Sequence, residues 1–208
     1  MNRILIFFII FTLQGCVSIN ETMDEMYNIS SQGQSKFDNS KYIRVEKIFC
    51  SNRIVFELYQ DSQKHKNGIV LLKAGINEVA NIGDGNSLHI KANNNIYSFK
   101  SNNIMTEYDT HIYPYGVTQP FSHKSYIISE KLIREMAFSK LFLAKVNLLN
   151  NSYIEGTCSP LTLSEYKEEY KGQSYLSSIT QADIDRANKY TAQIGFQKFI
   201  KLIESTEW

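Results

Sequence analysis

The sequence predicts an α+β domain with a mostly antiparallel sheet, followed by a C-terminal half in which a helix, a hairpin and further helices succeed one another. Short β-type runs separated by polar turns fill the chain between residues 41 and 128, and helical periodicity begins at Ser129. Thirteen Tyr and 12 Phe against a single Trp are typical of a β-rich domain. Strands first and helices later is the order that favours an α+β fold.

The first strands are predicted from apolar runs bounded by turn residues. Tyr42–Cys50 and Arg53–Gln60 are two such runs, and Gly68–Ile76 is apolar enough for a central strand. Leu88–Lys91 is expected to pair with Ile96–Lys100 across a polar turn. Further runs follow at Ile104–Asp109, His111–Tyr115 and Ser125–Ile128.

A helix and a hairpin are predicted next. Ser129 is a natural N-cap, and apolar residues recur at helical spacing behind it. Phe142–Leu149 and Ser152–Cys158 then alternate as strands, with Asn150 and Asn151 between them; Asn tolerates the positive φ of a tight turn.

Two capping signals predict the remaining helices. Thr162 and Glu165 form a capping box, and Thr180 opens the last helix in a similar way. The apolar stripe of that last helix is formed by Ala192, Phe196, Phe199 and Ile203. We expect this stripe to pack on the sheet, because Lys198, Lys201 and Glu204 occupy the opposite side.

The first sixteen residues carry a secretion signal. Arg3 precedes Ile4–Leu13, a run of ten residues of which nine are apolar. That run is far shorter than the roughly 20 residues that cross a bilayer, and it has the length of a signal-peptide apolar region. It ends in Leu13-Gln14-Gly15-Cys16, which resembles the lipobox of bacterial lipoproteins.

The resemblance implies that residues 1–15 are cleaved and that the Cys16 thiol carries a diacylglycerol, which anchors the chain in the bilayer. An Asp after the lipidated cysteine tends to retain such proteins in the inner membrane. Val17 and Ser18 follow here, so the periplasmic face of the outer membrane is expected. Residues 16–40 are then interpreted as the lipidated N-terminus and a flexible tether, and residues 41–208 as one globular domain.

Charge argues against a nucleic-acid partner. The whole chain has 22 basic and 21 acidic side chains, and loss of residues 1–15 would remove Arg3 and no acid. The mature chain would therefore be neutral, without the basic surface that nucleic-acid binders require.

Two cysteines remain after lipidation, Cys50 and Cys158. Because the compartment beyond the inner membrane is oxidising, we expect a disulfide between them. Such a bridge would stabilise the fold by about 4.7 kcal/mol on the chain-entropy model for a loop of about 100 residues. The alternative is two separate buried thiols.

No catalytic, metal or cofactor site is predicted. The four histidines are far apart in the sequence, and neither HExxH nor GxSxG occurs. Gly83-Asp84-Gly85 is interpreted as a turn, and the acidic residues Glu165, Glu168 and Glu169 as the solvated side of a helix.

One segment, from His111 to His123, is predicted to be a contact loop. It includes Tyr113, Tyr115 and Phe121, and it has no Lys, Arg, Asp or Glu. Tyr and Phe are enriched in protein interfaces, whereas Lys, Glu and Asp are depleted. The alternative is a Pro-stiffened connection whose rings cover the edge of the sheet.

These observations predict a non-enzymatic lipoprotein that acts through contact with an envelope protein, in envelope assembly, as a secretion accessory, or in immunity or exclusion. Two alternatives stay open, an envelope hydrolase with dispersed catalytic residues and a small-ligand-binding lipoprotein. A buried cleft with convergent His and carboxylates would favour the hydrolase, and an enclosed apolar cavity would favour the ligand binder.

Overall fold

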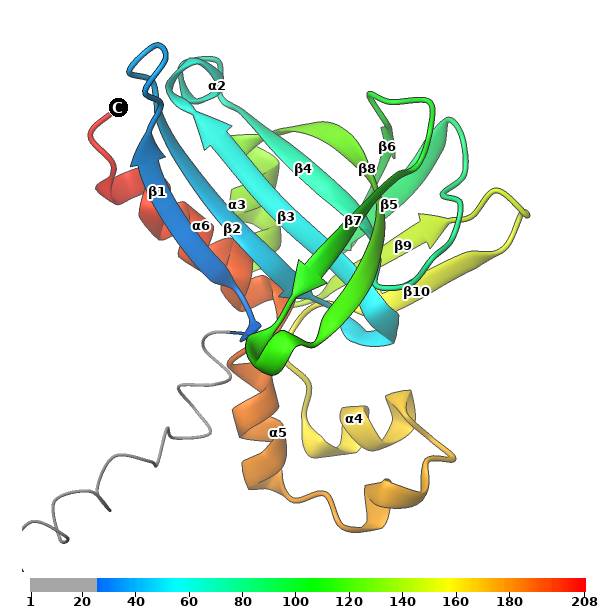
Figure 1. The fold of residues 1–208 in the computed structure, drawn as a ribbon. Coiled ribbons are helices and arrows are strands. Elements are labelled where there is room, and N and C mark those ends of the chain that lie inside the picture. Colours follow the sequence, from blue (N-terminus) through cyan, green and yellow to red (C-terminus); the bar gives the residue numbers. More distant parts are fainter. Residues whose placement is uncertain (1–25) are drawn as a thin grey trace, which may run out of the picture.

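The computed structural model describes residues 26–208 and shows two antiparallel sheets with helices packed against them (Figure 1). The predicted α+β class is confirmed. The strands are β1 (Ile29–Gln34), β2 (Lys41–Phe49), β3 (Ile54–Asp61), β4 (Ile69–Ile76), β5 (Asn86–Ala92), β6 (Asn95–Lys100), β7 (Glu107–Ile112), β8 (Thr118–Ser129), β9 (Phe142–Asn147) and β10 (Tyr153–Thr157). The α-helices are α2 (Ser62–Lys66), α3 (Glu130–Phe138), α4 (Leu163–Glu169), α5 (Gln181–Asn188) and α6 (Ala192–Ser205).

The larger sheet has six strands in the order β1-β2-β3-β4-β8-β7. Its third and fourth strands, β3 and β4, are the most apolar, and the prediction that Gly68–Ile76 is a central strand is confirmed. The register aligns Val45, Leu58, Leu72 and Tyr126 in one row across four strands. All four side chains are fully buried, so this row faces the core.

The smaller sheet has four strands in the order β10-β9-β5-β6. Both predicted pairings are confirmed, β5 with β6 and β9 with β10. Asn151 has a φ of 63° in the β9–β10 turn, which is the left-handed conformation that Asn tolerates.

Two helices close the core. The Ser129 hydroxyl accepts a hydrogen bond from the Leu132 amide at 3.3 Å and starts α3 as predicted. The apolar stripe of α6 packs against β2 and α3, and α6 lies across the same side of the larger sheet as α3 (Figure 1). The rings of Phe56, Phe142 and Phe196 meet with centroids 5.2 to 6.1 Å apart. This contact joins both sheets and α6 in one core.

The flexible tether predicted for residues 16–40 is wrong over its second part. Ile29–Gln34 forms β1, which pairs along its whole length with β2. Upstream of it, Tyr27 packs edge-to-face against Phe49. The side chains of this segment are polar, which favoured a tether in the sequence. An edge strand can have such side chains, because most of them are exposed and its backbone hydrogen bonds do not depend on them. The domain therefore begins before Lys41.

The single last helix predicted from Thr180 is also wrong. Thr180 does start a helix, and its capping box with Asp183 is present, but α5 ends at Asn188. A second helix, α6, starts after Thr191 and carries the apolar stripe. Between α4 and α5 the chain forms a lobe below the sheets (Figure 1), in which Ile184 is the buried residue of the two helices.

Candidate functional site

The segment predicted to be a contact loop is a β-hairpin, so the loop prediction is wrong. β7 and β8 pair from Glu107 opposite His123 to Ile112 opposite Thr118. The turn is a short 3-10 segment, Pro114–Gly116, in which Tyr115 and Gly116 have φ values of 63° and 72°. Two consecutive left-handed residues reverse the chain tightly, which leaves the flanking residues free to pair.

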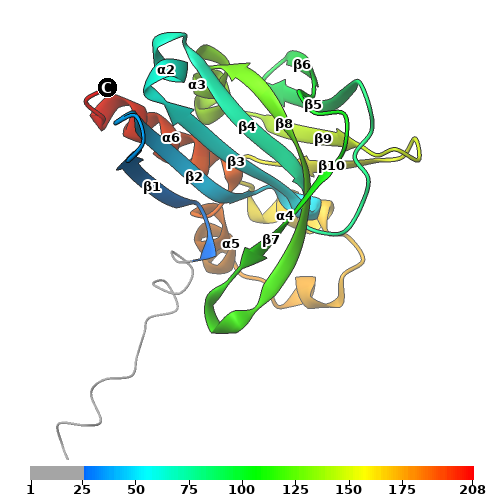
Figure 2. The same ribbon diagram turned by 45° about the horizontal axis from the view of Figure 1, so that its top comes forward.

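This hairpin curls over the outer side of the six-stranded sheet, the side opposite α6 (Figure 2). The glycine at position 75 permits the close approach of β8: a Cβ there would lie 1.9 Å from the Ser122 carbonyl oxygen. At the far end, the Lys47 ammonium donates to the Ile112 carbonyl and lies 4.6 Å from the centroid of the Tyr113 ring. The curl therefore covers one end of the outer side.

Burial divides the five residues of the predicted contact segment. His111, Tyr113, Phe121 and His123 are buried under or within the hairpin, whereas Tyr115 is 87% exposed at its tip. The His111 and Phe121 rings stack at 4.6 Å, and Phe121 and His123 follow at 4.7 Å. The structure therefore brings four of these residues together as packing and leaves only Tyr115, among the five, accessible to solvent.

Glu57 is the centre of a charge network beneath the hairpin. Its Oε1 lies 3.0 Å from His111 Nε2, and its Oε2 lies 3.1 Å from an Arg44 guanidinium nitrogen and 3.8 Å from Lys73 Nζ. Burial opposes ionisation of this carboxyl, but the hydrogen bond with His111 and the charges of Arg44 and Lys73 outweigh it. The pKa of Glu57 is therefore lowered.

Lys73 joins a second acid–base pair to this network. Asp109 Oδ2 lies 2.9 Å from Lys73 Nζ and 2.9 Å from His123 Nε2, and the hydrogen bond from Lys73 is the main cause of the lowered pKa of Asp109. Burial, helped by the charge of Lys73, lowers the pKa of His123. Glu107 lies 3.6 Å from the other ring nitrogen of His123. Opposite charges thus alternate across β2, β3, β4 and β7.

Beside the curled hairpin the same side of the sheet is hollowed into a groove of about 490 Å³. Tyr59 and Leu71 are cross-strand neighbours on its floor, and the Tyr42 and Tyr59 rings stack at 6.2 Å. The groove is lined by Ser35, Tyr42, Arg44, Glu57, Tyr59, Leu71 and Lys73. We call this the sheet groove; it combines aromatic rings with the outer part of the charge network.

The sheet groove offers aromatic rings and cationic side chains to a ligand. Both oxygens of Glu57 have partners: Oε1 faces His111, and Oε2 faces Arg44 and, at 3.8 Å, Lys73. His111 and Glu57 are each 5% exposed. Among residues 26–208 there is also no group of three His, Cys, Asp or Glu placed to hold a metal ion.

Sequence reasoning missed the residues of the sheet groove. Arg44, Glu57 and Lys73 lie on three different strands, and what aligns them is the register of β2 with β3 and of β3 with β4. The available signal was a charged residue, Glu57, within a run otherwise apolar enough to be buried.

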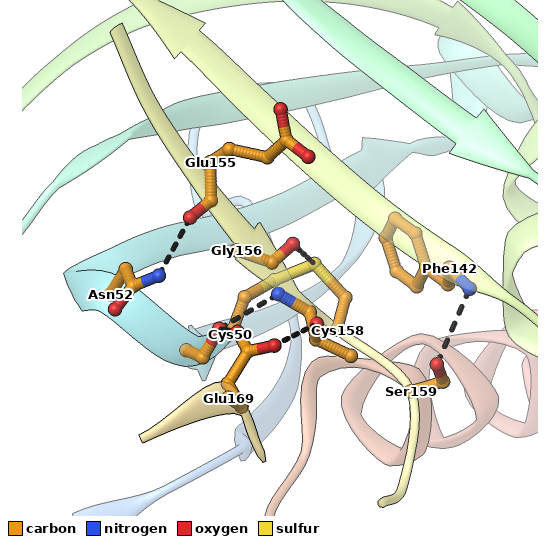
Figure 3. The surroundings of a disulfide bond; sticks show 10 residues. Cys50, Asn52, Phe142, Glu155, Gly156, Cys158, Ser159 and Glu169 are labelled. Carbon is orange, nitrogen blue, oxygen red and sulfur yellow. Dashed lines mark hydrogen bonds between the residues drawn. A yellow bond between two sulfur atoms is a disulfide. The ribbon is translucent and has the colours of Figure 1, made fainter. Parts of the chain in front are cut away.

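The predicted disulfide between Cys50 and Cys158 is confirmed. Their Cα atoms are 4.2 Å apart, inside the 7 Å limit for a bridge. Cys50 follows β2 and Cys158 follows β10, so the bond ties the two sheets together (Figure 3). Next to it the Asn52 side-chain amide donates to the Glu155 carbonyl at 2.8 Å, which joins the connection between β2 and β3 to β10.

The lipidation site predicted at Cys16 lies outside the described residues. Within the described part of the chain, no helix is long and apolar enough to span a membrane.

Comparison with known proteins adds little. No protein family and no curated protein matches the sequence. Among solved structures, invasion associated protein B from Bartonella henselae is similar over 63% of this chain and 82% of its own, with 8% identity and a TM-score of 0.36.

Proposed function

We propose that this protein is a lipid-anchored component of the bacterial envelope, on the periplasmic face of the outer membrane, that binds a partner protein through the sheet groove. The observation that carries the binding part is the lining of the groove, in which the stacked rings of Tyr42 and Tyr59 lie beside the Arg44 side chain. Half-buried Tyr and Arg side chains in such a groove are typical of protein interfaces.

The anchor is supported by the lipobox-like motif ending in Cys16. The Cys50–Cys158 bond agrees with an oxidising compartment. Growth with labelled palmitate tests the anchor: the wild-type protein incorporates label and Cys16→Ser does not. Label in Cys16→Ser would contradict lipidation at this position.

Site-specific crosslinking in intact envelopes tests the groove. A photo-crosslinking amino acid at Tyr59, in the groove, should capture one discrete envelope protein. The same amino acid at Tyr153, which is 58% exposed on the other sheet, is the matched control and should capture none. Equal adducts at both positions, or none at Tyr59, would contradict the proposal.

An envelope hydrolase is the second candidate, because His111, His123, Glu57 and Asp109 do converge beneath the hairpin. Burial of Glu57, His111 and His123 limits their access to a substrate, whereas the Asp109 side chain is half exposed. If the network were catalytic, Glu57→Gln would abolish hydrolysis by the purified protein; a partner-binding groove predicts that there is no such hydrolysis to abolish. A small-ligand binder is supported by the volume of the groove alone, which lies within the usual range of ligand pockets.

A further inference from the structure

A second cleft, independent of the sheet groove, lies where the α4–α5 lobe meets the sheets beside the disulfide. It has a volume of about 290 Å³. One wall is formed by Tyr27, with Phe49 at 5.3 Å and Tyr190 at 5.6 Å. A second wall is formed by Tyr166 and Tyr170, whose ring centroids are 4.5 Å apart. We call it the tyrosine cleft.

The position of the tyrosine cleft is held by hydrogen bonds between the lobe and the strands. The Glu169 carboxylate at the end of α4 accepts from the Ser51 hydroxyl at 2.7 Å and from the Thr157 hydroxyl at 3.2 Å. Ser51 and Thr157 are neighbours of the two bridged cysteines, and Figure 3 shows Glu169 beside the disulfide. The two aromatic walls are therefore fixed relative to each other by the same strand ends that the disulfide joins.

The lining of the tyrosine cleft is aromatic and uncharged. No side chain that lines it is acidic or basic. Burial raises the pKa of Tyr27, and it raises that of Tyr170 to about 12, so both hydroxyls stay neutral. The Ser159 hydroxyl accepts from the Phe142 amide at 3.3 Å, which leaves its own proton to donate (Figure 3). The hydroxyls of Ser51 and Thr157 already donate to Glu169. The cleft thus offers ring surfaces and the Ser159 hydroxyl to a neutral ligand.

A saccharide would need planar amide or carboxylate side chains to pair with its hydroxyl groups. Asn188 is the amide in the lining, and both its ends are used: Oδ1 accepts from the Leu161 amide at 2.9 Å and Nδ2 donates to the Leu161 carbonyl at 2.8 Å. A proline-rich peptide in the polyproline II conformation has different needs. Its prolines have no N–H to satisfy, its carbonyls accept, and its rings pack between aromatic side chains.

We propose that the tyrosine cleft binds a proline-rich, polyproline II segment of a partner protein. It is a separate surface from the sheet groove, so the two proposals stand or fall independently. The rings of Tyr166 and Tyr170 contact the prolines from one side and those of Tyr27 and Phe49 from the other. The preformed polyproline II helix has little conformational entropy to lose on binding.

Titration of the full-length mature protein with capped octaproline, followed by calorimetry and by NMR of the aromatic signals, tests this. We expect binding that weakens at least about tenfold in Tyr166→Ala and in Tyr170→Ala, as for other buried aromatic anchors. Tyr115→Ala removes an equally large, exposed ring that does not line the cleft, and this variant should bind as the wild type does. Chitotriose serves as the saccharide probe and should not bind.

Two binding results would overturn the proposal: no octaproline binding at millimolar concentration, or chitotriose binding in its place. Equal octaproline binding by the Tyr166→Ala and wild-type proteins would also overturn it. So would shifts of the Tyr115 NMR signals without shifts of the Tyr27 and Tyr166 signals. The NMR map of the wild-type protein needs no variant, so it decides the matter even if Tyr170→Ala unfolds the lobe.

Discussion

The two sides of the six-stranded sheet are built on the same strands but are stabilised in different ways. On the core side, the row from Val45 to Tyr126 buries apolar surface against α6 and the smaller sheet. On the outer side, Glu57 is almost as deeply buried, but among charged and polar partners. Apolar packing is non-directional, whereas a buried carboxylate depends on each partner. Substitutions on the two sides should therefore follow different rules.

The largest effect is expected on the core side, from Phe56→Ala. Phe56 touches Phe142 and Phe196, where both sheets and α6 meet. Removing the ring should lower the free energy of unfolding by about 4 kcal/mol, the usual cost of a buried Phe-to-Ala cavity. Urea denaturation measures it. Phe56→Leu, the control, should cost less than about 1.5 kcal/mol, and similar losses for both variants would show that the site is not closely packed.

The next effect tests the outer side with Glu57→Ala. Loss of the carboxylate leaves His111 buried without its acceptor and two cations without a shared anion. We expect the free energy of unfolding to fall by about 3 kcal/mol, as when one partner of a buried pair is removed. Equilibrium unfolding in urea at pH 7 is the measurement.

The matched control replaces both members of the pair. Glu57→Leu combined with His111→Phe substitutes apolar groups for the two buried polar ones, and this should recover most of the stability lost in Glu57→Ala. If the double variant were no more stable than Glu57→Ala, the loss of stability in Glu57→Ala would not come from leaving His111 without its partner.

The pH dependence of stability sharpens the same contrast. The pKa of His123 is lower in the folded protein than its ordinary 6.5, so its stabilising contribution is full above that value and is lost as pH falls toward the folded pKa. The lowered pKa values of Glu57 and Asp109 add a further loss below their ordinary 4.5 and 3.8. Urea midpoints should thus fall from pH 7.5 to pH 5, and fall faster below pH 4.5. In His123→Gln, the urea midpoint should fall less between pH 7 and pH 5 than it does in the wild type. If it fell equally in both proteins, protonation of His123 would not be the cause.

The smallest effects on stability are expected at the tip of the β7–β8 hairpin, where two nearby tyrosines differ in burial. Tyr113 is 6% exposed under the Lys47 ammonium, whereas Tyr115 is 87% exposed. Tyr113→Ala should lower the melting temperature clearly, and Tyr115→Ala should change the free energy of unfolding by less than about 0.5 kcal/mol. Calorimetric melting of both variants is the check. If Tyr115→Ala were the more destabilising, the burial assigned to this hairpin would be wrong.

Local patterns predicted much of the fold. Ser129 starts α3, Thr162 and Glu165 form their capping box, and the Asn150-Asn151 turn joins β9 to β10. Each depends on residues within a few positions of one another, where backbone hydrogen bonding and turn conformation are decided by the side chains present. The disulfide was predicted from the number of cysteines and from the oxidising compartment that the N-terminal signal implies.

Other features depended on residues far apart in the chain. The strand β1 looked like a linker because its side chains are polar, and its place in the sheet comes from pairing with β2. The hairpin looked like an exposed contact loop because its aromatic residues have no charged neighbours, yet the curl of β8 past Gly75 buries four of the five residues singled out.

The sequence by itself determined the α+β class, most strand and helix positions, the cysteine pair and an expected lipid anchor at Cys16. The tertiary structure alone decided which side of the sheet is charged, where Glu57 meets His111, and that two separate clefts exist. The physical reason is register: strand periodicity shows which residues share a side of their own strand, but only the pairing of β2, β3, β4, β8 and β7 decides which charges meet.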